Sequence, residues 1–448
     1  MKILKPGLVL LVIIFLITPT GLKAQSVERS TLQRATLPQL VEYALQNQPK
    51  IKQALLDEEI GERDINSALS GWLPQINANA NFNHNLKQAV SPLTMGGETT
   101  YITMGTKNSS GITVQADQQL LNAGLIQATK SAKYFPEQHE LNTENQSINT
   151  IVEVSKAYYD ILTSQEQLQI IIENIARLEK QFQDAKAQFD VGLVDKTDYQ
   201  RAQISLSNSK ADKKRTEELL IYKYAFLKSV IGYNPDADLT LSFDGQEMER
   251  NVLLDTTEVL NYQNRVEYRQ LLTSKQLQEI NTNYNKLQFM PSLSGFINYG
   301  WAYNHDEFSE LYSRSFPSSV VGLRLSIPIF SGTKRIQEIK KSQLLEERID
   351  LDIENTKNQI NSQYELAMAS YKANLNDWRV AAENVELSED VYNTIKLQYD
   401  EGIKTYLDLM TSETDLRTAQ LNYLNTLYSL LSAKLDVQQA LGTVSLNQ

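Results

Sequence analysis

The sequence KAQFDVGLVDKTDYQRAQISL, residues 186–206, has a counterpart 210 residues later in KLQYDEGIKTYLDLMTSETDL, residues 396–416. In each copy an aromatic residue, an aspartate and one further residue precede a glycine, Gly192 or Gly402. Long runs of helix-forming residues without glycine or proline lie on both sides. Glycine is common where a helix ends in a left-handed turn. The two stretches therefore predict two helical hairpins in tandem.

The elements around these hairpins repeat in one order: helix, strand, strand, very long helix, turn and helix. A proline precedes the first strand of each copy, in Leu73-Pro74 and Met290-Pro291. The predicted first repeat, residues 25–232, holds a helix at 37–70, strands at 75–86 and 111–121, a long helix at 125–190 and a helix at 197–231. The predicted second repeat, residues 258–448, holds a helix at 258–289, strands at 292–303 and 319–330, a long helix at 334–401 and a helix at 405–441. An irregular linker, residues 233–257, joins them.

Proline and loop composition refine this outline. Pro49 predicts a break in the first helix, and Pro136 predicts a bend early in the first long helix. Residues 87–110 are rich in Gly, Ser, Thr and Met and predict an exposed loop. The two shorter helices of the first repeat have lengths that suit end-to-end stacking beside the long one.

The predicted strands alternate in polarity. In residues 75–86, apolar side chains alternate with asparagines at 77, 79, 81, 83 and 85. Tyr299, Trp301 and Tyr303 share one face of residues 292–303, as in the aromatic girdle of a membrane β-barrel. Segments of about ten residues are long enough to cross a bilayer as tilted strands. A half-buried soluble strand alternates in the same way, but the uniform asparagine face favours a water-filled lumen.

The N-terminus has the features of a secretory signal peptide, residues 1–24. Lys2 and Lys5 precede the apolar run LVLLVIIFLI, and small residues precede Gln25. Ten apolar residues are too few for a transmembrane helix, which needs about 20. The signal peptide contains three lysines, Lys2, Lys5 and Lys23. Without them, the mature chain has 40 basic and 54 acidic residues and no cysteine. This balance argues against nucleic-acid binding, and disulfides are excluded.

Four strands cannot close a barrel, and lipid tolerates no open sheet edge. The chain is therefore expected to share a barrel with copies of itself, two copies giving eight strands and three giving twelve. The last helix has two adjacent apolar stripes, each containing leucines and a tyrosine, Tyr423 or Tyr428. A helix with a neighbour on each side needs two such stripes, as in the wall of a helical tube, although a buried bundle helix has them too.

The glycine turns, the proline-led strands and the tandem order resemble the TolC family of outer-membrane efflux proteins, over essentially the whole mature chain. The resemblance implies a mixed α and β fold, in which a trimer forms one outer-membrane β-barrel continuous with a long periplasmic α-helical barrel. It implies an exit duct for efflux or type I secretion, with a periplasmic adaptor and an inner-membrane pump as partners. Outer-membrane lipid would surround the β-barrel. A periplasmic coiled-coil scaffold without a pore is the alternative.

The resemblance also assigns residues to the helical tips. A gate that opens by iris-like untwisting would contain Thr197, Asp198, Tyr399, Lys404 and Asp408. The tip turns that dock the adaptor would contain Gly192, Leu193, Gly402 and Ile403. Lys404 stands where the family pattern has arginine, and Thr411 where a second aspartate is expected, which implies a weaker lock.

Both candidate aspartates have a simpler interpretation, because a carboxylate in the first turn of a helix is stabilised by the backbone amides. The three histidines, His84, His139 and His305, are far apart in the sequence and show no zinc-binding spacing. There is no G-x-S-x-G sequence and no phosphate-binding loop. The sequence therefore predicts no enzyme, no cofactor and no metal site, and transport energy must come from a partner.

Overall fold

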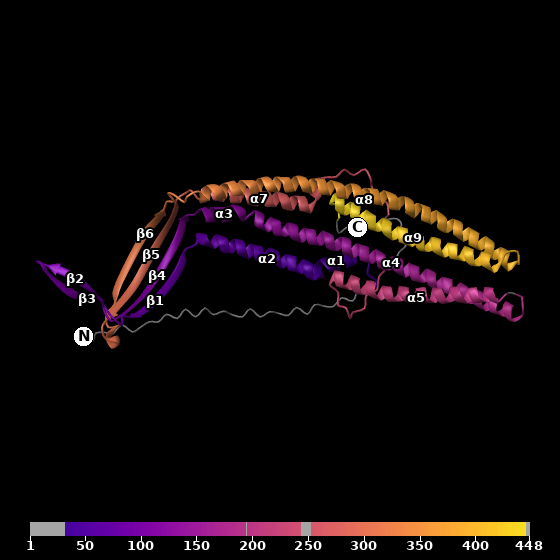
Figure 1. Ribbon diagram of the computed structural model, residues 1–448, viewed down its shortest axis with the longest axis horizontal. Helices are drawn as coiled ribbons and strands as arrows, with labels where there is room; N and C mark the ends of the chain where they lie inside the picture. The colour runs from indigo at the N-terminus through magenta and orange to yellow at the C-terminus, as the bar shows by residue number, and fades with distance from the viewer. Residues whose placement is uncertain (1–31, 194, 243–251, 445–448) are drawn as a thin grey trace, which may run out of the picture.

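The computed structural model describes residues 32–193, 195–242 and 252–444. The predicted signal peptide and part of the linker lie outside the described residues. A β-sheet lies at one end of the molecule, and long helices run from it to two turns at the opposite end (Figure 1). The helices are α1 (Leu37–Asn47), α2 (Pro49–Leu69), α3 (Ala123–Ser131), α4 (Tyr134–Asp190), α5 (Lys196–Ile231), α7 (Val266–Leu287), α8 (Lys334–Asp400) and α9 (Tyr406–Leu441). Within the described ranges, none of these helices has the length and apolar character needed to cross a membrane.

The main sheet is antiparallel, with strand order β1 (Gln75–His84), β4 (Asn108–Leu121), β5 (Ser292–His305) and β6 (Phe316–Ser326). Its register confirms the predicted alternation. The apolar residues Ile112 and Val114 pair with Trp301 and Tyr299, and Ile297 pairs with Val321. The other face is polar, as in the pairs Asn77–Gln115 and Gln115–Asn298. Each strand therefore contributes apolar side chains to one common face and mainly polar side chains to the other.

The predicted loop at 87–110 is wrong in part. It contains a two-stranded hairpin, β2 (Ala89–Met95) and β3 (Glu98–Met104), and β4 begins at Asn108. Gly96 and Gly97, with φ of 64° and 93°, form the turn. Threonine, valine, isoleucine and tyrosine beside them favour strands. The glycine, serine and methionine content obscured this pattern.

Three further boundaries differ from the prediction. The first long helix breaks at Ala132 and Lys133, and Pro136 lies in the first turn of α4, where its missing N–H costs no helical hydrogen bond. Helix α7 begins at Val266 rather than 258, after a 3₁₀ turn at Tyr262–Asn264. Strand β6 spans Phe316–Ser326 rather than 319–330. The last pair joins Ser326 to Ser292, which directly follows Pro291. Pro328, two residues beyond β6, has no amide donor, so it cannot extend the pairing.

The predicted end-to-end stacking is present at the middle of the helical part. Helices α2, α1 and α5 follow one another beside α4 (Figure 1). Gly232, the left-handed C-cap of α5 with φ of 69°, lies against the backbone of Asn47, where an added Cβ would be 2.7 Å from the carbonyl oxygen. In the second repeat, Gly442 after α9 has φ of 72°, and its Cβ would be 2.5 Å from the Asn264 oxygen. Glycine is needed at both junctions for the turn and for the close approach.

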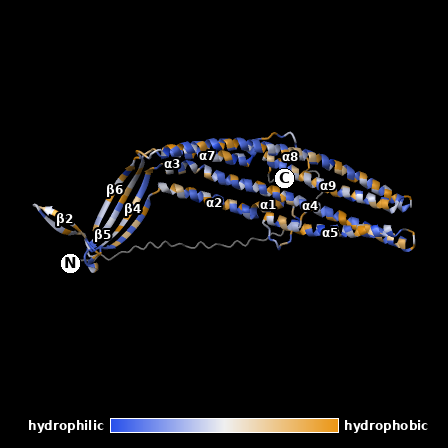
Figure 2. Ribbon diagram, viewed as in Figure 1, coloured by the Kyte–Doolittle hydropathy of each residue, from blue (hydrophilic) through white to orange (hydrophobic). Residues whose placement is uncertain are grey.

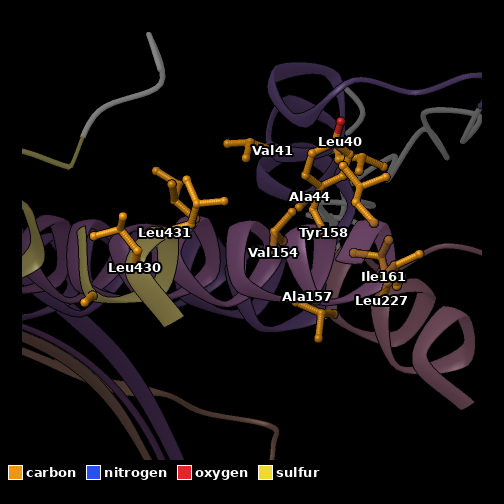
Figure 3. Packing of buried hydrophobic residues seen from close by; sticks show 14 of the residues in the cluster. Leu40, Val41, Ala44, Val154, Ala157, Tyr158, Ile161, Leu227, Leu430 and Leu431 are labelled. Atoms are coloured by element: carbon orange, nitrogen blue, oxygen red, sulfur yellow. The ribbon is translucent and has the colours of Figure 1, made fainter. Parts of the chain in front are cut away.

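The largest apolar cluster surrounds these junctions. The cluster includes fully buried residues from four helices, α1, α4, α5 and α9: Leu40, Val154, Ile161, Leu227 and Leu430 (Figure 3). Helix α9 packs against α8 on one side and α4 on the other, as its two stripes predicted. Outside this cluster, polar and apolar residues alternate along the helices (Figure 2). The middle of the helical part is therefore its main core.

Candidate gate at the helical tips

The two hairpins end in turns of the same geometry. Gly192 and Gly402 have φ of 77° and 76°, a region that glycine adopts without steric cost. In each turn the glycine amide donates to the carbonyl three residues earlier at 2.9 Å, and the next amide donates to the carbonyl five residues earlier at 2.8 Å, which joins Gly192 to Phe189, Leu193 to Gln188, Gly402 to Tyr399 and Ile403 to Gln398. Both are Schellman motifs, and they lie at the same end of the molecule (Figure 1).

Asp408 caps the helix that follows the second turn. Its Oδ2 accepts hydrogen bonds from the Thr405 amide at 3.0 Å and the Thr405 hydroxyl at 2.8 Å. The Asp408 amide donates back to the Thr405 hydroxyl at 3.2 Å, which completes a capping box. These bonds, together with the nearby Lys404 ammonium, lower the pKa of Asp408 below its ordinary value of 3.8. The first-turn interpretation of Asp408 is thus correct, and its gate role stays a prediction.

Tyr399 and Asp198, two of the predicted gate residues, are brought together between the hairpins. Tyr399 lies on α8, and its ring meets that of Tyr406 on α9 edge-on at 6.2 Å between centroids. Burial raises the pKa of Tyr399, and so do nearby carboxylates that include Asp198 on α5. Burial also raises the pKa of Tyr406, to about 12, with further contributions from Glu413, Tyr399 and Asp198. The tip of one hairpin therefore packs its two tyrosines against a small cluster that contains Ala185 and Ala202 of the other.

The remaining predicted tip residues are exposed. Leu193 and Ile403 expose 76% and 73% of their surfaces, one at the end of each hairpin. Thr197 and Lys404 are also exposed. Each tip turn therefore presents one large apolar side chain to the solvent.

Glu413 was missed by the sequence analysis. It lies on α9, is only 3% exposed, and accepts hydrogen bonds from Arg177 Nε at 3.1 Å and Gln181 Nε2 at 2.7 Å. Both donors lie on α4, so these bonds join the two hairpins. The sequence does carry a signal for it, because Tyr406, Glu413 and Leu427 are separated by multiples of seven residues and so share one face of α9. The apolar stripes of α9 alone do not include a glutamate.

No metal site is indicated in the part of the chain that the structure describes, where no three His, Cys, Asp or Glu side chains form a group able to hold an ion. Near the tips, the buried Glu413 instead pairs with Arg177 and Gln181 across helices. Their arrangement suits the mechanical coupling of two hairpins.

A family model described as outer membrane efflux protein matches residues 40–232 and 270–443, and these two segments correspond to the two repeats. The chain belongs to this family. This efflux protein is therefore an outer-membrane channel of a Gram-negative-type bacterium and serves efflux or secretion, as the sequence predicted. The alternative of a scaffold without a pore is not supported.

Relatives of this efflux protein are distant in sequence but match along most of their length. The outer membrane protein TolC of Vibrio cholerae is 22% identical over 421 residues, which cover 93% of this chain and 92% of the relative. The alkaline protease secretion protein AprF of Pseudomonas aeruginosa is 21% identical over 406 residues, which cover 87% of this chain and 81% of AprF. The crystal structure of the Campylobacter jejuni CmeC outer membrane channel superimposes with a TM-score of 0.73 at 16% identity. The match covers 96% of this chain and 92% of the CmeC chain. The predicted fold class, with its tandem repeat, is confirmed.

Proposed function

We propose that three copies of this chain form one continuous exit duct. The main sheet carries this proposal, because β1 and β6 each leave one edge unpaired in the single chain. The apolar residues on its common face, such as Ile76, Val321 and Leu323, are exposed. Lipid would cover that face, and neighbouring copies would pair with both edges. Four strands from each of three copies make a closed barrel of twelve.

The helices support the same assembly. Leu344, Leu351 and Leu387 are exposed along α8, and Ile204 and Ile221 along α5. Exposed apolar residues at intervals along a helix indicate a missing neighbouring helix. The α8 edge of one copy facing the α2 and α5 edge of the next would extend the wall into a closed tube.

The duct is proposed to be passive and not an enzyme. An inner-membrane pump would supply the energy, and a periplasmic adaptor would dock on the tip turns at Gly192, Leu193, Gly402 and Ile403. The gate at this end would contain Thr197, Asp198, Tyr399, Lys404 and Asp408, and it would open by untwisting of the hairpins. The packing of Tyr399 against the cluster that contains Ala185 and Ala202 of the other hairpin supports a closed tip.

Electron microscopy of the detergent-extracted protein tests this function. The expected particle is a hollow cylinder with three-fold symmetry and a tapered end. A monomer, or recovery in the soluble periplasmic fraction without detergent, would overturn the proposal and favour a scaffold.

Single-channel conductance tests the gate residues. Asp408→Ala and Lys404→Ala are each expected to raise the conductance of the closed form. Each removes one of the two opposite charges that are proposed to hold the narrow tip closed. Thr405→Ala is the matched control, since it removes the cap of α9 but keeps both charges. Unchanged conductance in both charge variants would show that these two residues do not form the gate.

A further inference from the structure

The contact between α4 and α9 changes character along its length. Near the middle of the tube, α4 contributes Ile161 and α9 contributes Leu427 and Leu430 to the main apolar cluster. Towards the tip, the same two helices meet through the buried Glu413 and its partners Arg177 and Gln181. We call these three residues the polar seam.

The polar seam keeps the register of the apolar part. Lys156 on α4 pairs with Asp436 on α9 at 2.6 Å, near the middle of the tube. Arg177 lies 21 residues further along α4, and Glu413 lies 23 residues earlier along α9. The helices are antiparallel, so both pairs belong to one continuous helix contact. The seam is therefore a local replacement of apolar layers by polar ones within a single interface.

Three polar atoms in or beside the seam are buried without a hydrogen bond in the described structure: Gln181 Oε1 in the seam, and Asn174 Oδ1 and the Tyr406 hydroxyl beside it. Asn174 is 2% exposed and lies seven residues before Gln181 on α4. A buried polar group without a partner destabilises the state that buries it. Separation of the hairpins would expose these groups to water, so they favour opening.

The bonds of Glu413 have the opposite effect. A buried carboxylate that loses its partners while it remains buried is strongly destabilising, so Arg177 and Gln181 hold the closed arrangement in register. An apolar interface of the same volume would be at least as stable and would offer no gain on hydration. The polar seam thus makes the hairpin contact specific but reversible.

We propose that Arg177, Gln181 and Glu413 are positioning residues of the gate, which hold the α8–α9 hairpin against the α4–α5 hairpin and set how readily the tips separate. This rests on the proposed function as a gated duct. Tyr406, which packs with Ala185 of α4 and Ala202 of α5 and is seven residues before Glu413, transmits the seam's position to Tyr399 at the tip.

Conductance of the full-length protein in planar bilayers tests the proposal. Glu413→Ala and Arg177→Glu are expected to raise the open probability about tenfold or more, because each leaves an unpaired group in the seam. The double variant Arg177→Glu with Glu413→Arg is expected to recover most of the wild-type value. The apolar double variant Arg177→Met with Glu413→Leu is expected to lower the open probability below wild type, because water no longer favours the separated state.

The matched control is Lys156→Met with Asp436→Leu, which removes a second ion pair between α4 and α9. This pair is more exposed, with 32% and 45% of the two side chains accessible, and it lies beside the apolar core. It is expected to change the open probability by less than about twofold.

The outcomes separate the two proposals. If wild type and all variants form pores with the same open probability, the polar seam has no positioning role, although the duct stands. If Glu413→Ala and the apolar double variant shift the open probability in the same direction, the reversible-contact argument is wrong. If no protein forms a pore, the proposed duct fails, and the positioning role fails with it.

Discussion

The middle and the tip of the helical tube use the same helices in different ways. At the middle, α4 and α9 bury Ile161 and Leu430 completely, and the junction glycines pack against neighbouring backbone. At the tip, the apolar clusters are small, and buried polar groups join the hairpins. A rigid middle with a separable tip is what a tube needs to open at one end without losing its fold.

The largest expected effect comes from the glycines that distinguish these regions. Gly442→Ala would place a Cβ about 2.5 Å from the backbone oxygen of Asn264, in addition to the left-handed φ. We expect it to cost about 4 kcal/mol and to reduce the yield of folded protein. Thermal unfolding in detergent and the yield of assembled protein measure this.

Gly402→Ala is the matched control at the tip. It has the same left-handed φ, but nothing lies within 4 Å of the added Cβ. We expect a cost of about 1 kcal/mol from the backbone conformation alone. Equal effects of the two substitutions would contradict the packed junction at the middle.

A second, smaller contrast compares two leucines of α9. Leu430 is fully buried in the main cluster, and Leu416 is 5% exposed in a small cluster with Tyr392 and Leu409. Leu430→Ala is expected to cost about 4 kcal/mol and Leu416→Ala about 2 kcal/mol, because the small cluster has room to relax around the cavity. Denaturant unfolding followed by fluorescence compares them. A larger loss at Leu416 would place the core at the tip.

The smallest effect concerns the cap at the tip. The pKa of Asp408 is lower in the folded protein than its ordinary value of 3.8. Its contribution to helix stability is therefore complete above that value and is lost as pH falls through the folded pKa. Hydrogen exchange at the start of α9, corrected for intrinsic rates, is expected to accelerate in this acidic range.

Asp408→Asn tests the cause of that acceleration. It removes the titrating carboxylate, so the corrected exchange rate at the start of α9 should no longer change with pH over the same range. If the variant kept the wild-type pH dependence, another group would be responsible.

Much of this fold was predictable because repetition and polarity are local properties of a sequence. The two glycine turns, the break at Pro49 and the stripes of the last helix required no knowledge of distant contacts. The β2–β3 hairpin was missed because its composition resembles a loop, and only its strand pairing defines it. The break before α4 was misplaced because a proline is compatible with the first turn of a helix as well as with a bend.

The candidate site was predictable only in outline. Tyr399 and Asp198 were assigned through the family resemblance, and the structure brings them together. Glu413 was not found, because its importance depends on burial against Arg177 and Gln181, which lie more than 230 positions away in the sequence.

The sequence by itself determined the tandem repeat, the strands with one apolar face, the long helices and their glycine turns, since each follows from local conformational preference and periodicity. Only the tertiary structure decided how the two hairpins pack against each other and where the apolar core gives way to polar contacts. It also decided that Asp408 is a cap, whereas Glu413 is a buried link between hairpins. The physical reason is that burial and pairing of a charge depend on side chains brought together by folding, and these are remote in the sequence.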